Sequence, residues 1–386
     1  MFLRANDSFA FDLLEIVHKE LPDRNIVISP LPVSLAFAAL SDGNMQVDSA
    51  EELETAFHWD GAFGLPDGAK MVLTRFEKPM PRPASHRAPP PGMPHATLMP
   101  LGKPEEVWLS TAFLYRGASS LSRDFIDKIT YDFGLPFRAV GEHAPQSEIL
   151  AKHWDPALPM PNVTAKNHFW ITSATHLRTS WDGNTFVDAK REKHEFRLRS
   201  GKVVQADFLE SEAEMYPYAR TAEFEAVVLA GKKAAILIVL PSVDASIEQL
   251  EAALAKRPNL VDPLLERREG DVRLPPFHFS FETDLRNPIE TMGVHRIFTN
   301  QDALLWMAPG KPGAVLQGVA QKTEITVDEE GIRADAGTIV SGIYGGIMQT
   351  IDPFHMTLDR PFLFLIRDRA TKLLLFEGAV MNPTLP

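Results

Sequence analysis

The segment from Val327 to Met348 most constrains what this chain can fold into. Every second residue from Ile332 is small or apolar, and the interleaved positions begin with charged residues; the first set is Ile332, Ala334, Ala336, Thr338 and Val340, and the second is Arg333, Asp335, Gly337, Ile339 and Ser341. Side chains of a strand point alternately to its two faces, so this segment can pair into a sheet with one face buried. Five glycines between Gly331 and Gly346 weaken such a strand. The pattern fits a segment that exists both as an exposed loop and as an inserted strand, and it also fits an edge strand followed by a glycine-rich turn.

Short apolar runs on both sides of this segment predict an α+β fold. Helices are expected at 30–40 and 122–133, and strands at 107–115, 169–176, 224–229, 234–240, 362–366 and 373–376. These elements alternate irregularly, without the regular strand-helix-strand rhythm of a parallel sheet. An amphipathic helix is expected near the start of the chain, with its N-cap among Asn6, Asp7 and Ser8.

A proline-rich stretch interrupts the chain at about 79–104. It holds nine of the 31 prolines, including three in succession at Pro89 to Pro91. Proline lacks the backbone N–H that helices and central strands need, so neither element can form here. We expect an exposed polyproline-type or disordered insertion; a docking or glycan-binding loop is the alternative.

Charge and cysteine content exclude several classes of partner and site. The formal charge of -12 argues against nucleic acid as the main partner, because a phosphate-binding surface needs an excess of Lys and Arg. The chain has no cysteine, which excludes disulfides, thiol catalysis and cysteine-based zinc sites.

The longest apolar run, Ala234 to Leu240, is far shorter than the roughly 20 residues of a membrane-spanning helix, so no membrane is expected as a partner. The first residues lack the pattern of a secretory signal, which predicts a cytoplasmic protein as written, or a secreted or periplasmic one if a signal was removed.

The usual signatures of catalysis are missing from the sequence. It contains no G-x-S-x-G elbow, no H-E-x-x-H, no phosphate-binding loop and no G-x-G-x-x-G. The 12 histidines are scattered without metal-ligand spacing. We therefore expect neither an enzyme nor a bound metal or cofactor, although a triad assembled from distant positions leaves no sequence signature.

Motifs spread along the chain resemble the serpins, a family of serine protease inhibitors. They occur in the family's order: Asn25-Ile-Val-Ile-Ser29-Pro30; Trp181 followed by Phe186 and Phe196; Val239-Leu-Pro241; Leu274-Pro-Pro-Phe277; Met292-Gly293-Val with Ile297-Phe298; Glu329-Glu330-Gly331; Arg360-Pro361-Phe; and Leu375-Phe-Glu-Gly378 through Pro383. Each motif alone is weak evidence. Their number and order make the resemblance strong.

The resemblance implies one domain over 1–386, with three β-sheets, a large central one among them, about eight or nine helices, and an exposed reactive-centre loop at about 329–360. It further implies a monomer that forms a covalent complex with a target serine protease, without a cofactor, by inserting the cleaved loop into the central sheet. The hinge of that loop is expected to comprise Glu329, Glu330, Gly331, Ile332, Ala334, Ala336 and Thr338. Its small, apolar face favours an inhibitor over a non-inhibitory binding or carrier protein, which stays the alternative.

The scissile bond is expected near the middle of the loop. The family's spacing from Glu329 places it at Tyr344, Gly345 or Gly346, and counting back from Pro361 moves it toward Ile347 and Met348. The lack of Arg and Lys from Ala334 to Leu358 disfavours trypsin- and thrombin-like targets, whose pocket needs a cation. Chymotrypsin-, elastase- or subtilisin-like proteases are the expected targets.

The region where the central sheet opens departs from the family's pattern. It is expected to include Ser29, Ser173, Trp181 and Gln321. The family usually has histidine where this chain has Gln321, and asparagine where it has Ser173. Different hydrogen-bond pairs must therefore hold this region, and the sequence leaves those pairs open.

Overall fold

The computed structural model describes residues 2–41, 45–59, 68, 71–72, 74–76, 105–116, 121–135, 137–140, 168–183, 185–186, 189, 191–309, 313–333 and 352–385. The α-helices of this part are α1 (Phe2–Glu20), α2 (Pro30–Ser41), α3 (Val47–Ala56), α5 (Arg123–Asp127), α7 (Ile247–Lys256), α8 (Arg286–Thr291) and α9 (Arg296–Thr299). A π-helical turn, η2 (Lys128–Asp132), follows α5, and a 3-10 turn, η3 (Asp262–Leu264), precedes β10.

The strands alternate irregularly with these helices, and the predicted α+β class is confirmed. They are β1 (Ile26–Ile28), β2 (Glu106–Arg116), β3 (Phe137–Val140), β4 (His168–Ser180), β5 (Arg191–Arg197), β6 (Val203–Glu210), β7 (Glu214–Arg220), β8 (Phe224–Ala230), β9 (Ala234–Pro241), β10 (Glu266–Leu274), β11 (Phe277–Asp284), β12 (Val315–Asp328), β13 (Gly331–Arg333), β14 (Phe354–Thr357), β15 (Phe362–Asp368) and β16 (Leu374–Val380).

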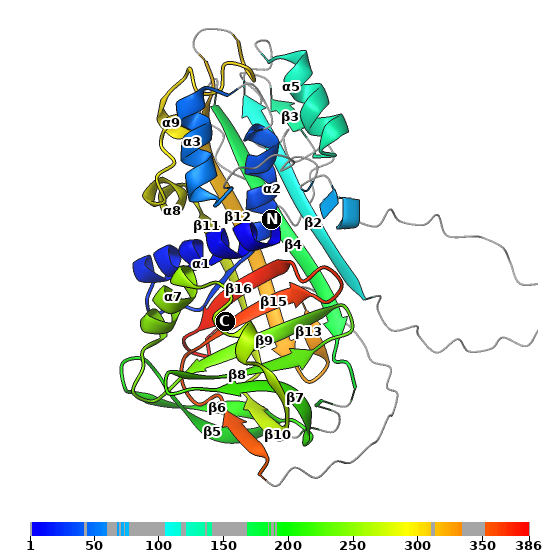
Figure 1. Ribbon diagram of the computed structural model, residues 1–386, viewed down its shortest axis with the longest axis vertical. Helices are drawn as coiled ribbons and strands as arrows, with labels where there is room; N and C mark the ends of the chain where they lie inside the picture. The colour runs from blue at the N-terminus through cyan, green and yellow to red at the C-terminus, as the bar shows by residue number, and fades with distance from the viewer. Residues whose placement is uncertain are drawn as a thin grey trace, which may run out of the picture.

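The long strands β2, β4 and β12 run side by side along the long axis in Figure 1. They belong to a six-stranded sheet with the order β11-β12-β13-β4-β2-β3. At one end β12 pairs directly with β4, in parallel, over Val315–Gln321 and His168–Ser173. At the other end β13 lies between them. The sheet is therefore closed at one end, and three residues of a further strand separate its central strands at the other.

The remaining strands form a second sheet, which crosses the lower half of the view in Figure 1. Its order is β1-β16-β15-β9-β8-β7-β10-β6-β5, and β14 pairs with β10 off this path. Strand β10 changes partner along its length: Glu266–Gly270 pair with β7, and Arg273 and Leu274 pair with β6. Two of the three sheets implied by the family resemblance are thus continuous through β10.

Helix α2 lies where the two sheets meet. Its residues from Pro30 to Leu40 are all buried, as the apolar sequence predicts. It contacts β2 and β4 of the six-stranded sheet and β16 of the other sheet. The short strand β1, which pairs with β16, also contacts β12. Ser29, between β1 and α2, is thereby held at the junction of the sheets.

Helix α1 begins at Phe2, so the predicted N-cap at Asn6 to Ser8 is wrong. The apolar face extends further toward the N-terminus than expected, because Phe2 packs on the core beside the buried Ala5. Asn6 consequently lies buried within the helix. Within the described ranges, no helix combines the length and the apolar character needed to cross a bilayer.

Candidate functional site

Strand β13 occupies the opening between β12 and β4 and pairs antiparallel with both. Gly331 lies opposite Asp328 and Ser180, Ile332 opposite Val327 and Thr179, and Arg333 opposite Thr326 and Arg178. Ile332 is 1% exposed, so its side chain faces the protein interior. Gly331 and Ile332 of the expected hinge are therefore already part of the sheet, and Glu329 and Glu330 form the turn before it.

Gly331 makes the turn from β12 into β13 possible. Its φ is +149°, and a Cβ atom at this position would lie 2.2 Å from the carbonyl oxygen of Thr179. Both the backbone conformation and the close approach exclude a larger residue. The Glu329-Glu330-Gly331 motif thus has a steric reason for its glycine in this chain.

Three contacts hold the turn that precedes β13. The guanidinium of Arg191, on β5, donates from Nη2 to both carboxylate oxygens of Glu329, at 2.8 and 3.1 Å. Partial burial would raise the pKa of Glu329, but a backbone hydrogen bond and Arg191 outweigh it and hold that pKa below its usual value. The indole N–H of Trp181 donates to the carbonyl of Asp328 at 2.8 Å, and the Asp328 carboxylate accepts from the Glu330 N–H at 2.9 Å.

A buried hydrogen-bond network holds the closed end of the opening. The Gln321 side chain accepts from the Ser29 N–H at 2.8 Å, donates to the Ser29 carbonyl at 2.7 Å and donates to Ser173 Oγ at 3.3 Å. Ser29 Oγ donates to the Leu375 carbonyl at 2.6 Å and lies 2.6 Å from Thr175 Oγ1. Gln321 and Ser173 also face each other in the β12–β4 ladder. One glutamine therefore bridges both central strands to the turn before α2.

The sequence profile described as "Serpin (serine protease inhibitor)" matches residues 4–98 and 154–383. The chain belongs to the serpin family. Serpins are generally protease inhibitors and not catalytic enzymes.

Relatives of this serpin match it to different extents. Serpin B3 of Homo sapiens is 30% identical over 234 residues, which are 58% of this chain and 58% of that protein. A serine protease inhibitor of Rattus norvegicus is 25% identical over an alignment of 402 residues, covering 98% of this chain and 88% of that protein. The matched stretch thus spans little more than half of Serpin B3 but most of the rat inhibitor.

Solved serpin structures share the fold of this chain. Human thyroxine-binding globulin complexed with thyroxine superposes with a TM-score of 0.77 at 20% identity, covering 100% of this chain and 99% of that one. Serpin48 of the insect Tenebrio molitor has a TM-score of 0.74 at 20% identity, covering 99% and 98% of the two chains. The TM-scores establish the shared fold, and the sequence profile confirms the predicted membership of the family.

The structure brings together three of the four residues expected at the sheet opening of this serpin, and it places the fourth, Trp181, at the hinge turn. Ser29, Ser173 and Gln321 form one hydrogen-bond network. Trp181 contacts the end of β12 and packs edge-to-face against Phe186, with the ring centroids 5.4 Å apart. Of the hinge, the described residues are Glu329 to Ile332. Ala334, Ala336, Thr338 and the five reactive-bond candidates Tyr344, Gly345, Gly346, Ile347 and Met348 lie outside the described residues, as does the proline-rich insertion up to residue 104.

Sequence reasoning missed two residues of this site, Arg191 and Thr175. Arg191 is 138 positions from Glu329, and Thr175 is 146 positions from Ser29. No local pattern links either pair. Over the part of the chain that the structure describes, His, Asp and Glu side chains form no group suited to a metal ion.

Proposed function

We propose that this serpin inhibits a serine protease as a suicide substrate, through a reactive-centre loop at about 329–360 of a single domain. The observation that carries the proposal is the position of β13 between β12 and β4. Residues 331–333 already lie between the two central strands, so the residues that follow them could extend β13 along both neighbours.

The proposed reaction uses the chemistry of the protease. Its serine attacks a carbonyl carbon of the loop, the peptide bond breaks, and the new amine end of the loop leaves while the acyl group stays on the serine. The cleaved loop then inserts as a strand and displaces the attached protease. This sequence requires a native state that persists because its conversion is slow, with strain released when the strand adds.

The register of β13 predicts where the following residues would lie after insertion. Continued along both neighbours, it brings Thr338 between Ser173 and Gln321, so insertion must break their 3.3 Å hydrogen bond. Ala334, Ala336 and Thr338 would share the buried face of Ile332, because side chains alternate along a strand. Asp335 would lie on the opposite face, between His176 and Glu324, whose carboxylate is largely exposed.

We also propose the protease class from the loop sequence. Tyr344 suits a chymotrypsin-like pocket, and Met348 suits an elastase-, chymotrypsin- or subtilisin-like pocket. No Arg or Lys occurs from Ala334 to Leu358 to meet the buried carboxylate of a trypsin-like pocket.

Incubation with chymotrypsin, elastase and subtilisin, followed by denaturing electrophoresis, tests the proposal. We expect a complex that survives denaturation and a cleaved chain with a higher melting temperature. Ala336→Arg, on the face that would be buried, should be cleaved without forming the complex, whereas Asp335→Arg, on the outer face near Glu324, should still form it. Cleaved chain alone with all three proteases, at an unchanged melting temperature, would instead indicate the carrier.

A further inference from the structure

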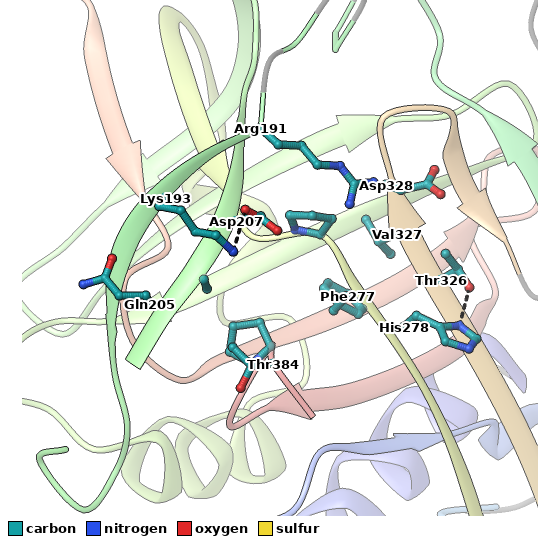
Figure 2. Close-up of a pocket in the computed structure, with 13 residues that line it drawn as sticks. Arg191, Lys193, Gln205, Asp207, Phe277, His278, Thr326, Val327, Asp328 and Thr384 are labelled. Carbon is teal, nitrogen blue, oxygen red and sulfur yellow. Dashed lines mark hydrogen bonds and ion pairs between the residues drawn. The ribbon is translucent and has the colours of Figure 1, made fainter. Parts of the chain in front are cut away.

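A cavity of about 500 Å³ lies next to the hinge turn, between β5 and β6 of one sheet and β11 and β12 of the other. Figure 2 shows its walls, with Arg191 and Lys193 on one side and His278 and Thr326 on the other. Pro276 and Pro383, which are partly exposed, contribute its apolar surface, and Phe277 and Val327 lie almost fully buried in its floor at 3% and 0% exposure. The volume of the cavity falls within the range of pockets that bind small organic ligands.

Four polar side chains of this cavity form two pairs within its own walls. Lys193 Nζ lies 2.9 Å from the carboxylate of Asp207, directly opposite it on β6. His278 Nδ1 lies 2.7 Å from Thr326 Oγ1, again from the facing position of the next strand. These pairs connect neighbouring strands, so a ligand would gain little by separating them.

Arg191 differs from these four residues, because its partner comes from outside the cavity lining and belongs to the hinge turn. Its guanidinium holds the carboxylate of Glu329 in the hinge turn, and the two side chains are 48% and 41% exposed. An ion pair with that exposure contributes little to stability, since water screens it. Because only Nη2 of the guanidinium contacts Glu329, Arg191 can exchange this carboxylate for that of a ligand at small cost.

We propose that this cavity binds a small amphipathic carboxylate. Its apolar part would lie against Pro276 and Pro383, and its carboxylate would replace that of Glu329 as the partner of Arg191. Binding of such a ligand would break the ion pair that holds the hinge turn to β5. Ligand binding would therefore affect how firmly β13 is held in the sheet. The binding site itself does not depend on the inhibitory function.

Isothermal titration calorimetry of the full chain tests this with 3-phenylpropionate as the probe. We expect Arg191→Gln to weaken binding about tenfold, because a charge-assisted pair is lost. Glu329→Gln should tighten binding by about 1.5- to 5-fold, since it removes the internal competitor, which is worth no more than an exposed ion pair. Arg197→Gln is the matched control, because Arg197 lies on the same strand but outside the cavity lining.

The neutral analogue 3-phenylpropanamide separates carboxylate recognition from simple apolar binding. The proposal predicts at least about tenfold weaker binding of the amide to the unmodified chain. Equal binding of amide and acid, no binding of the acid at millimolar concentration, or an unchanged affinity in Arg191→Gln would overturn the site. An affinity that stays the same in Glu329→Gln would overturn the exchange of carboxylates on Arg191. Circular dichroism of each variant confirms that it is folded.

Discussion

The side chain of Gln321 pairs with both backbone polar groups of Ser29, accepting from its N–H at 2.8 Å and donating to its carbonyl at 2.7 Å. The two residues are 292 positions apart and are 1% and 0% exposed. This amide-like pairing fixes the centre of β12 to the turn between β1 and α2. It also leaves one N–H of the Gln321 amide for Ser173 of β4.

Gln321→Leu should destabilise the native protein. It removes the partners of two buried backbone groups, and each such loss costs about 1–3 kcal/mol. Urea denaturation should show a lower midpoint with an unchanged slope. Lys322→Gln, a change at the neighbouring exposed position, is the control and should stay within about 0.5 kcal/mol of the original protein. Equal stability of the two variants would contradict a structural role for the network.

Gly331→Ala should expel β13 from the sheet. The added Cβ would lie 2.2 Å from the Thr179 carbonyl oxygen, and the φ of +149° disfavours any side chain. Hydrogen exchange at the amides of Ile332 and Arg333 should accelerate. Gly201→Ala is the control, because Gly201 has a φ of +82° with nothing within 4 Å of the added carbon. Its cost should be confined to backbone strain of about 1 kcal/mol, without faster exchange in β13.

Glu377, at the centre of β16, should destabilise the protein at neutral pH. Its side chain is 0% exposed, and neither carboxylate oxygen has a hydrogen-bond partner among the described residues. Burial, followed by the nearby charge of Asp7, raises the pKa of Glu377 well above 4.5, although Arg367 acts in the opposite direction. Glu377→Met should therefore raise the free energy of unfolding at pH 7 by about 1–3 kcal/mol, the usual penalty of an unsatisfied buried polar group.

The same glutamate predicts a pH dependence of stability. Its folded pKa lies above its unfolded pKa, so the folded state binds the proton more tightly. The stability that the tighter proton binding of Glu377 contributes is fully present below about pH 4.5, and it is lost as the pH rises through the folded pKa. Thermal unfolding between pH 4 and pH 9 should show a decline that is smaller in Glu377→Met and in Glu377→Gln. An identical decline in all three proteins would assign the effect to other groups.

His18 of α1 and Glu251 of α7 form a buried pair that should respond differently to single and double substitution. His18 Nδ1 lies 2.6 Å from Glu251 Oε1, and the side chains are 0% and 3% exposed. Burial favours the neutral ring, but Glu251 and the Pro22 carbonyl outweigh it and raise the pKa of His18. Either single change to leucine should cost about 3–5 kcal/mol, because it leaves one buried polar group without its partner.

The double variant His18→Leu with Glu251→Leu tests this pair by a thermodynamic cycle. It should be more stable than either single variant, since neither polar group is then left alone. Urea denaturation of the four proteins gives the coupling energy. Simple addition of the two single effects would show that the pair does not interact.

Local sequence patterns determined the elements whose burial is periodic or complete. The apolar run from Pro30 to Leu40 is a buried helix, and the alternation that begins at Ile332 places that residue on the buried face. The order of motifs along the chain also determined the family. The N-cap prediction at Asn6 failed, because helix α1 gained an earlier turn from the packing of Phe2 on the core.

Only the tertiary structure decided which groups meet at the sheet opening. The hydrogen bonds between Gln321 and Ser29 join residues 292 positions apart. The ion pair between Arg191 and Glu329 joins residues 138 positions apart. The lack of a hydrogen-bond partner for Glu377 among the described residues likewise depends on the elements that surround it. Periodicity reports which face of an element is buried, but hydrogen bonds depend on distances of about 3 Å between elements. Those distances are set by how the two sheets and α2 pack together, which no local stretch of the sequence specifies.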